Sequence, residues 1–407
     1  MKIAIAGAGV GGLAAAVLLT KAGREVTVFD QFDSPQPVGS GLVLQPVGQA
    51  VLQVCDVLDR ASAHGNPVHR MLGHEVDHGR PVLDVWYDRA HGVRHGLALH
   101  RNALFDALWT ATQAAGVTVH TGAKVAAAHA GHLTLETGET HGPYDLIIDA
   151  LGAKSPLTSM RSRALPYGAL WTNVDWPDGT DLPHDQLRQS YRRASNMIGV
   201  LPIGTPPGAS QRQAAVFWSL PRNGHEAWLA AGLDAWKAQA TKLWPALDPF
   251  VAQITDPAQM TMARYAHGTL DTPHGGGIVH IGDAAHCASP QLGQGANMAL
   301  LDAYALARAL EPDTTPEAAA TNYARQRRWH VRAYQMMSWA FTPQYQSDSR
   351  WLPVLRDRVL FPLSMIPPVP RVLSHLVCGT MLPAFAKGDP LRSFPRAPVQ
   401  PVPVPSD

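Results

Sequence analysis

The sequence predicts an α/β fold: a discontinuous Rossmann-like nucleotide-binding domain with an inserted, mainly antiparallel β-sheet domain and a C-terminal helical segment. Three observations predict it. At the N-terminus, a glycine-rich turn joins a short apolar strand to an apolar helix. A second strand, glycine-rich loop and helix follow much later, over residues 276–310. Between residues 166 and 264, short segments rich in β-branched and aromatic residues alternate with turn residues.

Composition narrows the class of protein before any motif is considered. The chain has 407 residues, of which 46% are hydrophobic and 16% charged, with 33 Lys and Arg against 32 Asp and Glu. This length suggests two or three domains or one composite unit. The near-neutral balance offers no basic surface for a nucleic-acid partner. Cys55, Cys287 and Cys378 are too few and too scattered for a disulfide framework or a cysteine-based zinc site, so we expect a reducing, cytoplasmic setting.

The N-terminal segment has the order of a dinucleotide-binding unit. We expect a buried strand over Ile3–Ala6, a helix through residues 13–19 and a second strand over Glu25–Phe29, which ends at Asp30. A signal peptide is the alternative interpretation, but glycines interrupt the apolar run and no small-residue cleavage site follows. The interrupting glycines are Gly7, Gly9, Gly11 and Gly12.

The spacing of these glycines matches what a bound pyrophosphate requires. Gly7 permits the tight turn, Gly9 lets the backbone approach the pyrophosphate, and Gly12 lets the helix pack closely on the strand. The helix N-terminus would bind the pyrophosphate, and Asp30, 18 positions after Gly12, would accept a hydrogen bond from a ribose hydroxyl. A purely structural turn is the alternative, but the strand, helix and acid at this spacing favour a dinucleotide site.

Residues 74–78, His-Glu-Val-Asp-His, match a zinc-binding pattern that requires a helix. The context argues against a helix, because Gly73 and Gly79 bracket the motif and Pro81 follows closely. We expect instead two strands joined by a turn at residues 77–80, and no metal site. The sequence also contains no G-x-S-x-G element, which excludes an α/β-hydrolase.

The second glycine-rich segment indicates which dinucleotide to expect. We predict a strand ending at Gly282-Asp283, a loop, and a helix that runs to about Leu310. Over roughly twenty positions this segment resembles the FAD-dependent aromatic hydroxylases, which are single-component flavoprotein monooxygenases built like p-hydroxybenzoate hydroxylase. The matching residues are Gly282-Asp283-Ala284-Ala285-His286, Pro290, Gly293-Gln294-Gly295, Asn297 and Asp302-Ala303.

The resemblance implies a set of cofactor contacts. Asp283 would accept hydrogen bonds from the ribityl hydroxyls, and Pro290 would form part of the wall beside the isoalloxazine. The backbone of Gly293-Gln294-Gly295 would approach the flavin, and Asn297 belongs to the same signature. The positive end of the helix that starts there would favour the anionic reduced flavin.

Two more stretches resemble the same family. Residues 38–46 are similar to the glycine loop that lines the flavin after the second strand, and this loop contributes Gly41. Residues 100–108 are similar to the helix whose leading arginine, here Arg101, reaches the cofactor. A salt-bridged surface position is the alternative interpretation of Arg101.

One departure concerns the strand expected over residues 144–150. The family carries an Asp-Gly pair after this strand, whereas this chain has Leu151-Gly152, followed by Lys154 and a displaced Arg161. Because the family uses this segment for both FAD and the nicotinamide, the missing carboxylate affects the expected NAD(P)H contacts more than those of FAD. Lys154 offers a positive charge in its place.

These signatures suggest how the chain is divided. The FAD-binding domain would comprise residues 1–70, 96–165 and 265–330, and the substrate domain residues 71–95 and 166–264. Residues 331–394 would form the C-terminal helical segment, and residues 395–407 a Pro-rich tail. We expect the substrate between the two domains. The candidate strands of the substrate domain are residues 171–176, 190–193, 196–202 and 214–219, and its candidate helix is Asp234–Leu243.

The C-terminal segment contains an apolar stretch over Val359–Pro368. Its prolines interrupt any span long enough to cross a membrane. Three alternatives stay open for this stretch: packing on the core, contact within a homodimer, and contact with a membrane surface.

The resemblance implies an enzyme that hydroxylates a hydrophobic, aromatic small molecule. NAD(P)H would reduce FAD, O2 would add at flavin C4a, and the resulting hydroperoxide would transfer one oxygen atom to the substrate. No catalytic side chain is assigned, although a His or Tyr of the substrate domain is a candidate base. One alternative is an oxidase, dehydrogenase or reductase of the same fold without oxygen insertion. Another is a non-catalytic flavin-binding protein that sequesters a reactive intermediate.

Overall fold

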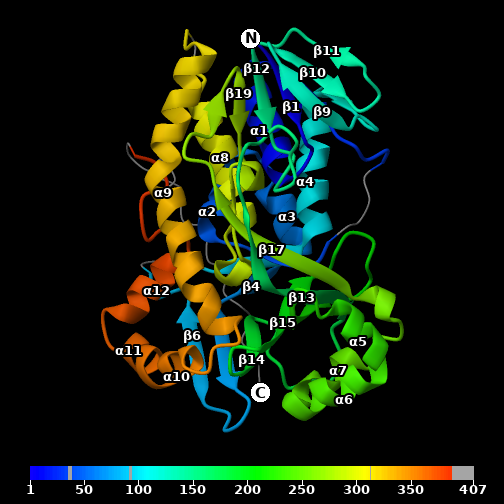
Figure 1. The fold of residues 1–407 in the computed structure, drawn as a ribbon, viewed down its shortest axis with the longest axis vertical. Helices are drawn as coiled ribbons and strands as arrows, with labels where there is room; N and C mark the ends of the chain where they lie inside the picture. The colour runs from blue at the N-terminus through cyan, green and yellow to red at the C-terminus, as the bar shows by residue number, and fades with distance from the viewer. Residues whose placement is uncertain (35–38, 91–93, 312, 387–407) are drawn as a thin grey trace, which may run out of the picture.

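The computed structural model describes residues 1–34, 39–90, 94–311 and 313–386. The expected Pro-rich tail, residues 387–394 and the start of the 38–46 loop lie outside the described residues. Figure 1 shows a parallel sheet with its helices in the upper half and a second, larger sheet in the lower half. The long helix α9 (Pro316–Tyr345) runs down one side, beside both halves.

The upper sheet has six strands and brings the N-terminal strand to its centre. Its interior strands are apolar and buried, as expected for a sheet covered on both faces. All neighbours pair in parallel except β18 and β19. In spatial order the strands are β18 (His274–Gly275), β19 (Ile278–His280), β12 (Leu146–Asp149), β1 (Lys2–Ala6), β2 (Glu25–Phe29) and β8 (Thr118–His120).

Helix α1 (Val10–Lys21) lies at the centre of the main hydrophobic core, because every residue from Gly11 to Leu19 is buried. It packs against α8 (Gly295–Ala309) and α4 (Arg101–Ala114). Helix α2 (Pro46–Val54) also packs against α8. Helix α3 (Leu58–His64) packs against both α2 and α4. A helix that is apolar on all sides needs such cover on all sides.

Two three-stranded sheets adjoin this domain. One has the order β3 (Gly41–Leu44), β7 (Gly96–His100) and β4 (Asn66–Val68). The other has the order β11 (Thr140–His141), β10 (His132–Leu135) and β9 (Val125–His129). The first packs against the larger sheet through β15, and so joins the two halves of the molecule.

The larger sheet has eight strands, and all its pairs are antiparallel except β14 with β5. One face packs on a core covered by α5 (His225–Ala231), α6 (Leu233–Leu243) and α7 (Asp248–Val251), and the other on a core next to the upper half. The strand order is β20 (His286–Cys287), β17 (Thr261–Thr269), β13 (Arg163–Asp175), β16 (Gln213–Pro221), β15 (Asn196–Gly204), β14 (Gln186–Arg192), β5 (Arg70–Glu75) and β6 (Pro81–Trp86).

The C-terminal elements are short helices that follow α9. Helix α10 (Leu352–Leu355), the π-helical turn η5 (Arg356–Leu360) and α11 (Phe361–Ser364) form one helical run. Helix α12 (Val369–Val377) returns to β6 and packs Val377 and Cys378 into the core beside the larger sheet. No helix among the described residues is long and apolar enough to span a bilayer.

The predicted fold class is confirmed, and so is the interpretation of residues 74–78 as part of a hairpin, since β5 and β6 pair antiparallel there. The strand end predicted at Gly282-Asp283 was wrong. The strand before the second glycine loop ends at His280, because Gly282 adopts a positive φ of 57° and starts the 3-10 turn η3 (Gly282–Ala284). The domain division stays a prediction, and four of its boundaries fall inside an element: 70/71 in β5, 165/166 in β13, 264/265 in β17 and 330/331 in α9.

Candidate cofactor site

The N-terminal turn requires glycine at two positions for reasons internal to the protein. Gly7 has a φ of 105°, and a methyl group there would lie 2.5 Å from the carbonyl oxygen of Ala150. A methyl group at Gly12 would overlap the carbonyl oxygen of Gly7. The turn therefore packs tightly on the end of β12, as the spacing predicts.

The two glycine-rich segments, far apart in the sequence, meet in the structure. A methyl group at Gly11 would lie 3.3 Å from the β-carbon of Ala299 in the first turn and a half of α8. A methyl group at Gly282 would lie 3.1 Å from the same β-carbon. The N-terminal ends of α1 and α8 are thus neighbours, so one ligand can contact both.

Both helix N-termini are open to an anionic or electron-rich ligand. Neither α1 nor α8 has a side-chain cap or an acidic residue in its first turn. The first backbone N–H groups of a helix have no partner within it, and they carry partial positive charge. Apart from chain neighbours and the helix's own backbone, no atom of the described residues lies within 4 Å of the position that a β-carbon would take at Gly9 or Gly295. These open positions fit a dinucleotide whose pyrophosphate lies at one helix and whose ring lies at the other.

The segment from η3 to the first turn of α8 contains the flavin contacts that the second signature predicts. Asp283 and Pro290 are exposed, and Gly293 ends the 3-10 turn η4 (Pro290–Leu292) with a φ of 60°. Asp283 keeps part of its side chain exposed, but desolvation by the surrounding protein raises its pKa, and the charges of His286 and Arg101 act in the opposite direction. Arg101, at the start of α4, is therefore close enough to act electrostatically on Asp283. We call residues 288–295 the flavin loop.

Asn297 holds the flavin loop in place from the first turn of α8. Its side chain is fully buried, and its Oδ1 accepts a hydrogen bond from the backbone N–H of Gln45 at 2.8 Å. Its Nδ2 donates to the carbonyl oxygens of Gly293 at 2.8 Å and Val43 at 3.3 Å. The side-chain amide is thus engaged within the protein, which leaves the backbone of Asn297 for contact with a cofactor.

Gln294 and Gln45 place polar atoms at the same end of α8. Gln294 donates from Nε2 to the carbonyl oxygen of Val377 at 3.3 Å. The Oε1 atoms of both glutamines are buried without a hydrogen-bond partner among the described residues. A buried polar atom without a partner is costly, so these atoms indicate a ligand.

Gly41 and Asp30 have contacts within the protein that the sequence did not predict. A methyl group at Gly41 would lie 2.5 Å from Ile203 and 2.7 Å from Ala215, so this glycine allows β3 to pack on the larger sheet. The Asp30 carboxylate accepts hydrogen bonds from the backbone N–H groups of Ala8 at 2.5 Å and Phe32 at 3.2 Å. It thereby fixes the start of the glycine turn. A contact of Asp30 with a ribose hydroxyl stays a prediction.

Sequence reasoning missed Asp149, which lies two positions before the residue that departs from the family pattern. Its buried carboxylate accepts hydrogen bonds from Ser155 Oγ and His280 Nδ1, both at 2.7 Å, and from the backbone N–H of Leu151 at 3.1 Å. Asp149 therefore holds the loop whose Ala150 packs on Gly7 and Gly12. The available signal was an acidic residue at the end of an otherwise apolar strand.

A second missed group is a buried ionic network between α8 and α9. Asp302 accepts hydrogen bonds from His286 Nε2 at 2.6 Å, Arg327 Nε at 2.8 Å and the backbone N–H of Gly282 at 2.9 Å. Burial raises the pKa of Asp302, but His286 and Arg327 outweigh this and lower it to about 2. The network fixes the backbone at Gly282, the residue immediately before Asp283. His286 and Asp302 are part of the quoted signature, but sequence alone assigned them no role.

Comparison with known proteins identifies the family. Residues 1–338 match the family model described as an FAD binding domain. The chain belongs to this FAD-binding family. The predictions of family, enzyme class and FAD as cofactor, with NAD(P)H as co-substrate, are confirmed.

Individual relatives of this FAD-binding protein are similar over most of their length. A putative 2-heptyl-3-hydroxy-4(1H)-quinolone synthase of Rhodococcus erythropolis is 29% identical over 75% of this chain and 78% of its own. Kynurenine 3-monooxygenase of Stenotrophomonas maltophilia is 27% identical over 83% of this chain and 78% of its own. The structure of Klebsiella pneumoniae HpxO, complexed with FAD and uric acid, superposes with a TM-score of 0.78 at 20% identity, and covers 95% of this chain and 98% of its own.

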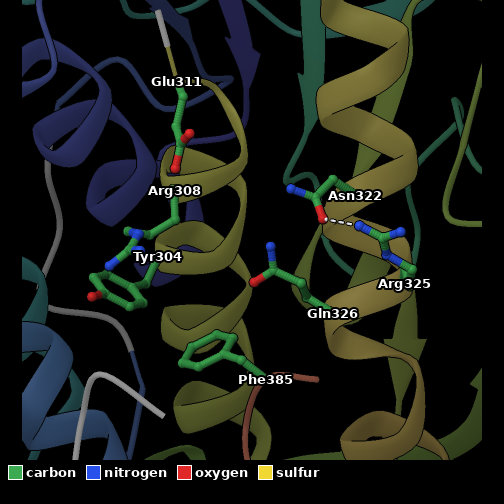
Figure 2. A pocket seen from close by; sticks show the side chains of 7 residues that line it. All are labelled: Tyr304, Arg308, Glu311, Asn322, Arg325, Gln326 and Phe385. Carbon is green, nitrogen blue, oxygen red and sulfur yellow. Dashed lines mark hydrogen bonds between the residues drawn. The ribbon is translucent and has the colours of Figure 1, made fainter. Parts of the chain in front are cut away.

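A separate pocket of about 220 Å³ lies between the C-terminal half of α8 and the N-terminal half of α9. Figure 2 shows its lining side chains, among which Arg325 donates a hydrogen bond to Asn322 at 2.9 Å. None of the predicted FAD contacts lines it, so it is distinct from the FAD site. Its lining residues are Tyr304, Arg308, Glu311, Asn322, Arg325, Gln326 and Phe385.

Proposed function

We propose that this protein hydroxylates a hydrophobic aromatic molecule held between the flavin loop and the larger sheet. The observation that carries the proposal is a contact across that junction. Gln291 of the flavin loop and Gln189 of β14 each place their amide nitrogen 3.8 Å from the sulfur of Met197 on β15. The residues expected to hold the flavin ring and one face of the larger sheet therefore adjoin at Met197.

The face of the larger sheet at this junction suits a planar aromatic ligand. Trp171 and Phe217 pack with ring centroids 4.7 Å apart, and Tyr191 and Tyr345 with centroids 5.2 Å apart. Met197 belongs to the same apolar cluster. Aromatic rings and a polarisable thioether favour contact with a flat, conjugated molecule.

Unpartnered polar atoms narrow the substrate class further. The Oε1 atoms of Gln45, Gln189 and Gln294 and the Oγ of Ser289 are buried without a partner among the described residues. A ligand that donates hydrogen bonds would satisfy them. We therefore infer an aromatic substrate with ring N–H or O–H groups. The compounds named for the relatives, a quinolone, kynurenine and uric acid, support this class.

The chain's own residues would bind, orient and shield the reactants. Bound FAD supplies the redox chemistry: two electrons come from NAD(P)H, one atom of O2 enters the product, and the other leaves as water. The turn at Gly9 and the start of α1 would hold the pyrophosphate, and Asp283 would orient the ribityl chain. The apolar cluster around Met197 would keep water from the reacting atoms.

The three cysteines are buried and form no disulfide, which supports the predicted cytoplasmic setting.

Isotope labelling tests the proposal. The FAD-loaded protein is mixed with NADH or NADPH under labelled O2, and 4-quinolones, hydroxypyridines and ortho-amino aromatic ketones are screened as substrates. We expect one or more of these compounds to accelerate NAD(P)H oxidation and to gain one labelled oxygen atom. Substrate oxidation without label would favour the oxidase or reductase alternative. Flavin that NAD(P)H never reduces, with every compound present, would favour a flavin-binding protein without turnover.

A further inference from the structure

Exposed apolar side chains are concentrated in the C-terminal part of the chain. Among the described residues, fourteen large apolar side chains are exposed, and thirteen of them lie between Trp329 and Leu382. Trp351 is 81% exposed, Trp329 67% and Trp339 65%. Single exposed apolar residues are common on protein surfaces, but a concentration of this kind marks an interaction site.

Most of these side chains belong to two helical surfaces that lie next to each other. On α9, Trp329, Met336 and Trp339 are spaced by seven and three residues, which places them on one stripe opposite the buried side. The run α10–η5–α11 exposes Val354, Leu355, Val359, Leu360 and Leu363. Helix α10 contacts α9, and Figure 1 shows α10, α11 and α12 gathered at the lower end of α9. We call the exposed residues between 328 and 372 the C-terminal face.

Packing on the core, one of the three alternatives left open for Val359–Pro368, is only partial in this part of the chain. Arg356 anchors the run from the inside: its guanidinium lies 5.0 Å from the ring centroids of both Tyr191 and Tyr345, and its Nη1 donates to Gln344 O at 2.9 Å. Val377 and Cys378 are also buried. The apolar side chains that point away from these anchors have no cover among the described residues.

Positive charge accompanies the exposed apolar residues. Residues 325–386 contain eight arginines and no lysine against two aspartates and no glutamate, although the whole chain has a net charge of only +1. Arg328, Arg350, Arg358 and Arg371 are exposed, and none of them forms an ion pair with a described residue. The C-terminal face is thus both apolar and cationic.

A hollow of about 580 Å³ lies beside this face, between the helical run and the β5–β6 hairpin. Arg350, Arg358 and Val354 line it together with Arg80 and Arg193. Glu75, Asp77 and Asp357 also line it, so positive groups outnumber negative ones by four to three. The hollow places cationic groups at the edge of the apolar surface, where the headgroups of lipids would lie.

We propose that the C-terminal face binds the surface of an anionic lipid bilayer. Apolar and Trp side chains enter the headgroup–acyl boundary, and exposed arginines pair with lipid phosphates, as in other interfacial helices. A second copy of the chain fits less well, because a symmetric contact would place the same arginines against one another without acidic partners. The prolines and the short helices agree with a segment that lies on a membrane and does not cross it.

Vesicle sedimentation with the full-length, FAD-loaded protein tests this proposal. We expect the protein to pellet with vesicles that contain about one-third phosphatidylglycerol in phosphatidylcholine, and to bind pure phosphatidylcholine at least tenfold more weakly. High salt should release most of the bound protein, because it screens the arginines. Brominated lipid should quench part of the tryptophan fluorescence, since Trp351 would enter the bilayer.

Paired variants locate the binding surface. Arg358→Gln with Arg371→Gln should weaken binding about fivefold for each arginine, and Trp351→Ser with Ile366→Ser should weaken it at least tenfold. Leu229→Ser with Arg212→Gln is the matched control, because both residues are exposed in the larger sheet's domain. We expect this control to bind like the unchanged protein. Retained FAD content shows that each variant folds.

Three results would overturn the proposal. In the first, the unchanged protein binds anionic and neutral vesicles equally, or binds neither kind. Another is equal binding by the arginine variant and the control variant. The third is a homodimer, measured by light scattering, that the Trp351→Ser and Ile366→Ser variant dissociates while anionic vesicles bind no protein; this would make a second copy the occupant of the face.

Discussion

Gly9 differs from Gly7 and Gly12 in what a side chain at its position would meet. Side chains at Gly7 and Gly12 would collide with the backbone, whereas a β-carbon at Gly9 would meet no atom within 4 Å among the described residues other than its chain neighbours. The conformation of Gly9, with φ −73° and ψ −177°, also suits a β-branched residue. We therefore predict that Gly9 is needed for the ligand and not for the fold, so a substitution at Gly9 can test the two roles separately.

Gly9→Val should give a folded protein that does not retain FAD. The added side chain would occupy the space that the pyrophosphate needs, so we expect at least a hundredfold loss of affinity for FAD. Absorbance after dialysis measures it, and far-UV circular dichroism checks the fold. Gly275→Val is the matched control, since that position is equally open but lies in the edge strand β18. Normal FAD loading by Gly9→Val would show that the pyrophosphate binds elsewhere.

Asp283→Ala should weaken FAD binding without unfolding the protein, because Asp283 is exposed. Hydrogen bonds to a charged group contribute about 1.5–3 kcal/mol, which corresponds to about a 10- to 150-fold change in the dissociation constant. Titration of the apoprotein with FAD, followed by flavin fluorescence, gives this constant. An unchanged constant would contradict the assignment of Asp283 to the ribityl chain.

At the scale of elements, the pairing of α8 with α9 depends on a buried ionic network. Arg327 is 2% exposed and donates hydrogen bonds to Asp302 and to the carbonyl oxygen of Ala384, both at 2.8 Å. Removal of one partner of a buried pair leaves an uncompensated charge, which costs about 3–5 kcal/mol. Loss of either partner should therefore weaken the pairing of α8 with α9.

Arg327→Met should lower the free energy of unfolding, measured in urea, by about 3–5 kcal/mol. Arg325→Met, on the exposed side of the same helix, should change it by less than about 0.5 kcal/mol. We also expect the Arg327 variant to lose FAD, because Asp302 would no longer hold Gly282. Equal effects of the two substitutions would show that the network contributes nothing specific.

The same network gives the protein a pH-dependent stability. Burial and the Arg327 charge lower the pKa of His330 from 6.5 to about 3. The unfolded chain therefore binds a proton near pH 6.5 that the folded protein does not take up until about pH 3. Between these values the unfolded state binds more protons, so stability decreases as the pH falls.

His330→Gln should flatten this dependence. We expect the free energy of unfolding of the unchanged protein to fall between pH 6.5 and 4.5 by up to about 1.4 kcal/mol more per unit than that of the variant. Asp302 does not contribute in this window, because its pKa of about 2 matters only below its ordinary value of 3.8. Parallel pH profiles for the two proteins would contradict the assignment to His330.

At the scale of the whole molecule, the proposed substrate site exists only where the flavin loop meets the larger sheet. Gln189 contributes a buried amide oxygen without a partner among the described residues, so it is a cost to the fold unless a ligand pairs with it. Gln186 lies on the same strand, and its Oε1 is also without a partner among the described residues. Side chains alternate between the two faces of a strand, so Gln186, three positions from Gln189, faces the opposite side of the sheet.

Gln189→Leu should leave stability unchanged or higher and should raise KM for the aromatic substrate about tenfold, because a hydrogen bond to the ligand is lost. Gln186→Leu is the matched control, and we expect it to leave KM unchanged. Steady-state kinetics and urea unfolding give both readouts. If the two variants had the same KM, Gln189 would not face the substrate.

The sequence by itself determined the features that depend on local geometry. The glycine turn after β1, the helix over 295–309 and the turn at residues 77–80 each follow from the backbone conformations and spacing of neighbouring residues. The family signature around Asp283 belongs to the same class, because its residues lie in one continuous stretch. Such features do not depend on how distant parts of the chain pack.

Only the tertiary structure decided what these features surround. Nothing near Asp149 in the sequence indicates that it would pair with His280, and nothing near Met197 indicates contact with both Gln189 and Gln291. The exposure of Ile366 is equally non-local, since packing on the core was one of the alternatives for the apolar stretch Val359–Pro368. Contacts between distant segments depend on strand order, register and helix packing, and these are properties of the assembled fold and not of any short stretch of residues.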